Sequence, residues 1–155
     1  MSARVLFATA AALLLAGCAR RFIPGTEIED NEDTSAIVQL MEKYRQAVEA
    51  RDTQALMALV SPQFHDNQGT STPEDDLDYR SLPQALNDRF ARITDVHLSI
   101  DVRNIDVQKD DATAVYYWTM NWRMPGLSDK PQSASELKRM QFKRVDRVWK
   151  IVSGI

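Results

Sequence analysis

A long run of alternating side chains constrains the fold more than any other part of the sequence. Between Ala112 and Arg123, every even-numbered position is apolar, and most odd-numbered positions are polar or amphipathic. The even-numbered row consists of Ala112, Ala114, Tyr116, Trp118, Met120 and Trp122. Successive residues of a strand point to opposite faces, so this row predicts one long strand with a covered face and a solvated face. We expect the even-numbered side chains to lie inside the domain.

Helical periodicity precedes this strand. Apolar residues recur at three- and four-residue steps over 37–48, 56–60 and 82–93, which predicts three amphipathic helices. Residues 33–35 offer N-caps for the first helix, and Ser81 offers one for the third. The N-terminal half of the domain is therefore expected to be helical.

Further strands follow the third helix. Alternating apolar residues predict strands over 96–107, 140–142 and 148–152, on either side of the central row. The alternation in 96–107 slips by one residue near Arg103-Asn104, which predicts a β-bulge that bends the strand. Three helices followed by four antiparallel strands define an α+β domain. A bent sheet of this kind is expected to curl around a helix and leave a cone-shaped space.

The N-terminus has the pattern of a bacterial lipoprotein signal. Arg4 supplies a positive charge, and residues 5–15 are apolar or small except for Thr9. This run fits a signal peptide and is too short to span a bilayer. It ends in Leu15-Ala16-Gly17-Cys18, which resembles a lipobox. We therefore expect residues 1–17 to be removed and residues 18–33, which are rich in acids, to form a disordered tether.

Cys18 is the only cysteine, so an internal disulfide is impossible and lipidation is the simplest role for its thiol. An ordinary secretory signal with a fortuitous cysteine is the alternative. Ala19 follows the cysteine, and by resemblance to Gram-negative lipoproteins the absence of Asp there favours the outer membrane. The prediction is a domain held by lipid at the periplasmic side of the outer membrane.

Charge and composition exclude several classes of function. The formal net charge is −3 and becomes −4 once Arg4 is removed, so nucleic acid is not an expected partner. The chain has two histidines and no spacing of ligands typical of a metal site. It also lacks a glycine-rich phosphate loop and a nucleophile elbow. The sequence predicts no metal and no cofactor.

The chain resembles the NTF2-like superfamily of the SnoaL and ketosteroid-isomerase type over residues 34–155. The residues that carry the resemblance are Tyr44 and Asp52 in the first helix pair and the closing Val148-Trp149-Lys150-Ile151. It implies three N-terminal helices packed on a strongly bent four-stranded antiparallel sheet with one additional short strand. The enclosed cone is implied to hold a small apolar molecule.

The same resemblance provides a test for isomerase chemistry. Ketosteroid isomerases use a carboxylate base and an oxyanion site made by a tyrosine and a protonated aspartic acid. Tyr44 matches the tyrosine, and Asp66 is displaced by a few residues from the position of the base. The second oxyanion donor falls at Met140, whose thioether cannot donate a proton. Tyr44 and Asp66 are thus the candidate catalytic residues, and the incomplete set favours a non-catalytic protein.

The predicted ligand pocket is lined by Tyr44, His65, Trp118, Trp122 and Met140. Amphipathic aromatic side chains are typical of apolar ligand sites. The alternative is that the aromatic row only packs in the hydrophobic core. Both interpretations are compatible if the narrow end of the cone is packed core and its wide end is an open ligand pocket.

Three hypotheses follow for the function. The first is a non-catalytic envelope lipoprotein that binds a small apolar ligand or a protein partner. The second is an isomerase- or dehydratase-like enzyme that uses Tyr44 and Asp66. The third is an assembly component of the envelope that forms a homodimer through the outer face of its sheet.

Overall fold

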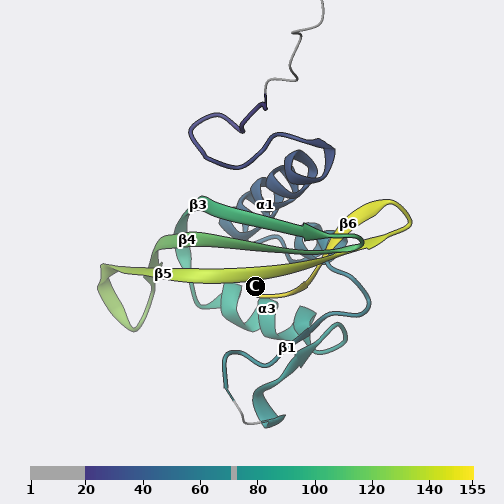
Figure 1. Cartoon of the computed structure of the whole chain (residues 1–155). Coiled ribbons are helices and arrows are strands. Elements are labelled where there is room, and N and C mark those ends of the chain that lie inside the picture. Colours follow the sequence, from purple (N-terminus) through teal and green to yellow (C-terminus); the bar gives the residue numbers. More distant parts are fainter. Residues whose placement is uncertain (1–19, 71–72) are drawn as a thin grey trace, which may run out of the picture.

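The computed structural model describes residues 20–70 and 73–155. Three helices lie against a four-stranded antiparallel sheet, so the predicted α+β class is confirmed (Figure 1). Cys18 and the predicted signal segment lie outside the described residues, and the lipid anchor stays a prediction. Within the described residues, no helix has the length and hydropathy needed to cross a bilayer.

The three helices match the predicted periodicity. They are α1 (Glu32–Ala50), α2 (Thr53–Leu59) and α3 (Leu82–Ala91). Helix α1 begins earlier than predicted because the side chain of Asn31 accepts hydrogen bonds from the backbone N–H groups of Asp33 and Thr34. Ser81 precedes α3, but its hydroxyl bonds to Asp78 and leaves the helix amides uncapped.

The sheet has strand order β3-β4-β5-β6. Its strands are β3 (Thr94–Gln108), β4 (Asp111–Met124), β5 (Ser128–Val145) and β6 (Val148–Ser153). Val102 pairs with Tyr116 and Asn104 pairs with Val115, so Arg103 has no partner of its own on β4. The bulge predicted at this position is confirmed.

The alternation along β4 has the predicted orientation. Ala114 and Tyr116 are fully buried, and Met120 is 8% exposed. On the other face, Tyr117 is 47% exposed and Arg123 is also exposed. The even-numbered side chains therefore face the helices, as the two-residue period requires.

The core lies between this face of the sheet and the helices. Its members run from Ile28 to Ile151, and α1 contributes Ile37, Met41 and Tyr44 to its centre. All three helices and all four strands of the main sheet contribute buried apolar side chains to this core. Residues 20–155, which include all of these elements, are accordingly expected to fold.

One ionic cluster ties α1 to the β5–β6 hairpin. The carboxylate of Asp33 accepts hydrogen bonds from Arg144 Nη2 at 2.9 Å and from Trp149 Nε1 at 3.1 Å. The guanidinium of Arg144 also lies 4.5 Å from the centre of the Trp149 ring. The hydrogen bond from Arg144 holds the pKa of Asp33 below its usual value.

The short additional strand differs from the prediction. Strand β1 (His65–Asp66) pairs with β2 (Leu77–Asp78) in a separate two-stranded sheet, beyond the 3₁₀ turn η1 (Pro73–Asp75). It does not extend the main sheet, because the loop after β1 folds back and supplies β2 as a nearer partner. At the main sheet, Val60 makes only an isolated bridge with Ile151.

The segment before α1 also differs from the predicted tether. Phe22 and Glu29 form an isolated bridge, and the side chain of Ile28 is 5% exposed. The hydroxyl of Thr26 closes the turn by donating to the Ile23 carbonyl at 2.9 Å. The acids suggested disorder, but one apolar side chain and a closed turn are enough to hold residues 22–29 on the domain.

Candidate functional site

A groove opens between α3 and the C-terminal part of β4, and we call it the α3–β4 groove. Its volume is about 520 Å³, within the usual range for small-ligand sites. Its lining consists of Ala85, Asp88, Arg89, Arg92, Ile93, Trp118, Met120, Trp122, Met124 and Lys138. Because β4 presents every second side chain to this space, the aromatic row forms an apolar floor.

A small inner cavity continues the groove toward α1. It measures about 40 Å³ and shares Arg89, Trp118 and Lys138 with the groove. Tyr44 reaches it from α1 and is 5% exposed. Within the described part of the chain, the Tyr44 hydroxyl has no hydrogen-bond partner. Burial raises the pKa of Tyr44 to about 12, so at neutral pH this group is a protonated donor that faces open space.

Cations surround the apolar floor. Arg89 lies in the last turn of α3, and Arg92 follows at its C-cap. Lys138 comes from β5, and its ammonium lies 4.9 Å from the centre of the Trp118 ring. A cation over an indole face is favourable, so this contact holds Lys138 beside Trp118 at the groove. The site therefore combines aromatic surface with positive charge.

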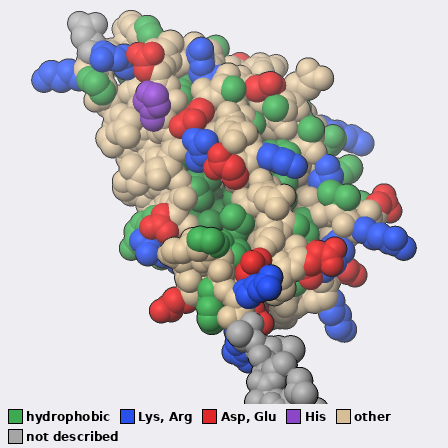
Figure 2. Space-filling model, turned by 90° about the horizontal axis from the view of Figure 1, so that it is seen from above, with side chains coloured by type: hydrophobic (Ala, Val, Ile, Leu, Met, Phe, Trp, Pro, Cys, Tyr) green, Lys and Arg blue, Asp and Glu red, His purple; other side chains and the backbone are tan. Residues whose placement is uncertain are grey.

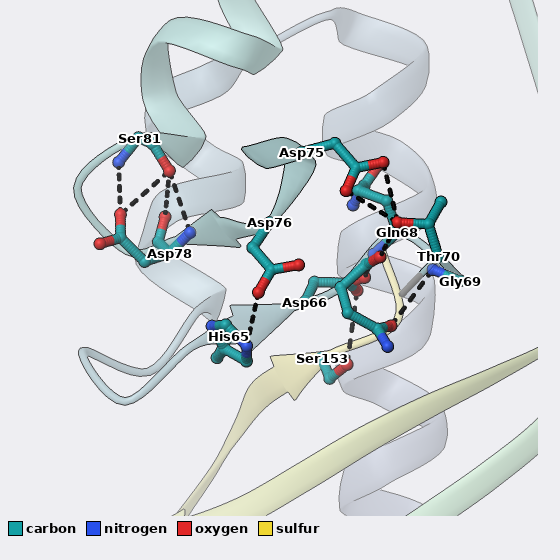
Figure 3. A network of polar contacts seen from close by, with 11 residues as sticks. His65, Asp66, Gln68, Gly69, Thr70, Asp75, Asp76, Asp78, Ser81 and Ser153 are labelled. Atoms are coloured by element: carbon teal, nitrogen blue, oxygen red, sulfur yellow. Dashed lines mark hydrogen bonds and ion pairs between the residues drawn. The ribbon is translucent and has the colours of Figure 1, made fainter. Parts of the chain in front are cut away.

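A second cavity lies around Asp66, and we call it the Asp66 cavity. It measures about 350 Å³ and is lined by Asp66, Asn67, Gln68, Gly69, Glu136, Leu137, Lys138, Arg139, Ser153, Gly154 and Ile155. Asp66 is 7% exposed, and both of its oxygens are engaged (Figure 3). It accepts from the backbone N–H of Gly154 at 2.5 Å and of Gln68 at 2.8 Å, and Ser153 Oγ lies 3.4 Å away.

Asp66 thus connects β1 to the end of β6. The Gly154 carbonyl in turn accepts a hydrogen bond from the Tyr116 hydroxyl at 3.2 Å. Three donors therefore hold the Asp66 carboxylate against the end of β6. The arrangement serves to close the structure around Gly154.

The structure brings together some of the predicted pocket residues and separates others. Tyr44 and Trp118 meet at the inner cavity, and Trp122 lies further along the α3–β4 groove. Met140 is fully buried in the core and lines neither space. The side chain of His65 is 63% exposed and lies 3.3 Å from Asp76 in the loop drawn in Figure 3.

The contribution of α3 to the site was missed. The apolar periodicity over 82–93, which includes Phe90 and Ile93, indicates only the buried face of this helix and gives no role to Arg89. Lys138 was also missed as a lining residue, although it lies two positions before Met140 and hence on the same face of β5. Extending the alternation backward from Met140 would have found it.

The surface of the molecule carries both signs of charge. On the face shown in Figure 2, acidic and basic side chains are interspersed around a central hydrophobic area. Among residues 20–70 and 73–155, no three His, Cys, Asp or Glu side chains gather as a metal site. The two cavities are therefore the candidate sites.

Comparison with known proteins identifies the fold. A family model described as a SnoaL-like domain matches residues 37–154. No curated protein sequence matches the chain. A ketosteroid isomerase-like protein from Erwinia carotovora atroseptica has a TM-score of 0.68 at 12% identity, covering 81% of this chain and 95% of its own.

Two further solved structures have the same arrangement. A putative dehydratase of the NTF2-like family from Streptomyces avermitilis has a TM-score of 0.63 at 16% identity, with coverage of 79% and 93%. A conserved protein from Planctomyces limnophilus has a TM-score of 0.68 at 14% identity, with coverage of 79% and 92%. At these identities the likeness concerns the fold alone.

Proposed function

Because the chain belongs to the family of SnoaL-like domains, with their NTF2-like α+β fold, we propose that it is a non-catalytic binding protein whose α3–β4 groove holds a small apolar molecule. The observation that carries this proposal is the floor of the groove. Trp118 and Trp122 remain partly accessible there on either side of the buried Met120, while Ala112, Ala114 and Tyr116 on the same row are sealed in the core. Aromatic side chains at the mouth of a pocket favour apolar ligands.

The state of Asp66 supports the non-catalytic part of the proposal. A general base must lie within hydrogen-bond reach of the proton that it removes. Asp66 already accepts from Gly154 and Gln68, and it borders the Asp66 cavity rather than the groove. Met140 occupies the position expected for a second proton donor and is buried in the core.

Fluorescence tests the proposal on residues 20–155. The neutral probe N-phenyl-1-naphthylamine is expected to bind saturably with enhanced emission. Trp118→Ala should weaken this binding about tenfold, because an aromatic anchor in a pocket carries much of the binding energy. Tyr117→Ala is the matched control, since Tyr117 lies on the outer face of the same strand. Absence of saturable binding to the unaltered protein would contradict the proposal.

The proposal includes a lipid anchor at Cys18, on the periplasmic side of the outer membrane. It rests on the lipobox-like residues and on the lack of any partner cysteine. Metabolic labelling of the full chain with an alkyne fatty acid is expected to mark the protein and not its Cys18→Ser variant. Equal labelling of both would refute the anchor.

A second candidate is an isomerase- or dehydratase-like enzyme. The observation that favours it is the Tyr44 hydroxyl, which faces the inner cavity without a partner in the described residues. Such a donor stabilises a developing oxyanion. If this candidate holds, the protein will catalyse deuterium uptake from D2O into an enolisable ketone such as cyclohexenone, and Tyr44→Phe will abolish it. No exchange above the buffer rate would count against it.

A third candidate is a homodimer formed through the outer face of the sheet. Tyr117 and Leu137 are directly opposite each other on β4 and β5, at 47% and 55% exposure. Exposed apolar pairs in a sheet face favour association with another surface. Sedimentation of residues 20–155 and of Leu137→Lys at high concentration tests it, and a strict monomer in both would exclude the homodimer.

A further inference from the structure

The charges of the α3–β4 groove are unbalanced. Arg89, Arg92 and Lys138 line it together with a single carboxylate, that of Asp88. In the described part of the chain, none of the three cations lies within 4.0 Å of a carboxylate. Elsewhere the exposed arginines Arg103 and Arg123 both have acidic partners. The groove thus gathers three cations that have no ion-pair partner among the described residues.

The nearby acids do not supply that compensation. Asp88 accepts a hydrogen bond from the Gln84 side chain at 2.8 Å, one turn back on α3. Glu136, two residues before Lys138 on β5, lines the Asp66 cavity and not the groove. An anion in the groove would therefore meet a net positive field that low-dielectric aromatic walls strengthen.

Two of the cations occupy a particular place. Arg89 and Lys138 each line both the groove and the inner cavity, so they flank the junction between the two. The Tyr44 hydroxyl opens into the same inner cavity. A guanidinium, an ammonium and a hydroxyl then surround one small volume, and all three are donors. The groups that satisfy three converging donors are acceptors, and an ionised acceptor such as a carboxylate forms charge-assisted hydrogen bonds with them.

We propose that the ligand of the α3–β4 groove is an amphipathic carboxylate, with its carboxylate at the junction between Arg89 and Lys138 and its apolar body along Trp118, Met120 and Trp122. This inference rests on the proposed function, because it specifies which small molecule the groove takes. The groove holds about 520 Å³, and the inner cavity of about 40 Å³ admits little more than the head group. The ligand is thus oriented, with the head inward and the tail toward the open end.

A matched pair of ligands tests the inference on residues 20–155. Octanoate and octanol share one apolar body and differ in charge, and each can displace N-phenyl-1-naphthylamine. Octanoate is expected to compete at least about tenfold more tightly than octanol, because charge-assisted hydrogen bonds are about twice as strong as neutral ones. Octylammonium, with the opposite charge, should compete more weakly than octanol.

Variants locate the effect. Arg89→Met and Lys138→Met keep an unbranched apolar stem and remove the charge, so each should weaken octanoate binding severalfold more than octanol binding. Arg103→Met is the control, because Arg103 lies over Tyr117 on the outer face of the sheet. Thermal unfolding of each variant establishes that it is folded.

The possible outcomes distinguish failure of the carboxylate inference from failure of the proposed binding function. If the neutral probe does not bind, the proposed function fails and the inference fails with it. If the probe binds and octanol competes as well as octanoate, the groove is apolar only and the inference alone is overturned. A preference for octanoate that survives in both groove variants would also overturn it, since the carboxylate would then be bound elsewhere.

Discussion

The α3–β4 groove and the Asp66 cavity share Lys138 as a boundary but differ in how their polar groups are used. In the Asp66 cavity the carboxylate binds two backbone amides, and Gly154 is held through both its N–H and its carbonyl. In the groove and its inner end, Tyr44 has no hydrogen-bond partner and Arg89 has no carboxylate within ion-pair distance, as far as the described residues go. In the Asp66 cavity, Asp66 and Gly154 are therefore satisfied by hydrogen bonds within the protein. In the groove, donors remain available for a ligand.

The largest expected effect lies on the Asp66 side, at Gly154. Its φ is +92°, and a Cβ there would meet the Arg139 carbonyl oxygen at 2.1 Å. Gly154→Ala should therefore lower the free energy of unfolding by about 3 kcal/mol or more, because backbone strain and a clash act together. Urea denaturation measures the loss. A stability equal to that of the unaltered protein would show that the end of β6 is not held as described.

The next effect tests whether Asp66 is structural. Asp66→Ala leaves the amides of Gly154 and Gln68 without their acceptor and should cost about 2 kcal/mol of stability. Its affinity for the apolar probe should stay within about twofold of the unaltered value, since Asp66 does not line the groove. Asp66→Asn retains one acceptor oxygen and should be milder. Loss of probe binding in a folded Asp66→Asn protein would show that the Asp66 cavity and the α3–β4 groove act as one binding site.

A substitution remote from both cavities provides a reference for these losses of stability. Asp33→Asn removes the ion pair with Arg144 and should cost about 1 kcal/mol at pH 7, since the pair is partly exposed. The pKa of Asp33 is lowered in the folded state, so its contribution is present above the unfolded value of 3.8 and is lost as the pH falls through the folded pKa.

Urea titrations of both proteins across this range are the measurement for Asp33. The difference between them should be largest near neutral pH and should shrink in acid. A difference that grows in acid would mean that the carboxylate is not stabilised by Arg144.

The smallest expected effect on stability is at Tyr44. Its hydroxyl has no partner in the described residues, so Tyr44→Phe should change the free energy of unfolding by less than about 0.5 kcal/mol. Octanoate affinity should nevertheless fall severalfold, because one donor at the junction is removed. A clear loss of stability would show that this hydroxyl is satisfied internally, as in the Asp66 cavity, and the contrast between the two cavities would disappear.

Periodicity predicted those features that are local in the sequence. The two-residue period placed Trp118 and Trp122 on the inner face, and its slip located the bulge at Arg103. The helical period placed Tyr44 on the buried face of α1. Each of these is a statement about one element, and the backbone geometry of that element fixes it.

Features that depend on how helices and strands pack against one another could not be predicted from the periodicity of a single element. Met140 shares a face with Lys138, but only the position of α3 decides that Lys138 reaches the groove and Met140 the core. His65 points outward beside Asp76, between buried Phe64 and buried Asp66, and this alternation was visible only once β1 was known to be a strand. Ile28 was overlooked because one apolar side chain among acids gives no period at all.

If Cys18 carries the proposed lipid, the turn at residues 22–29 lies close to the membrane anchor. Only three residues lie between Cys18 and Phe22, so the two Cα atoms are at most about 14 Å apart at full extension. Figure 1 places this turn on the α1 side of the molecule and α3 on the opposite side. With such an anchor, the α1 side of the domain would lie toward the bilayer and the groove beside α3 would open toward the aqueous compartment, from which a ligand would then arrive.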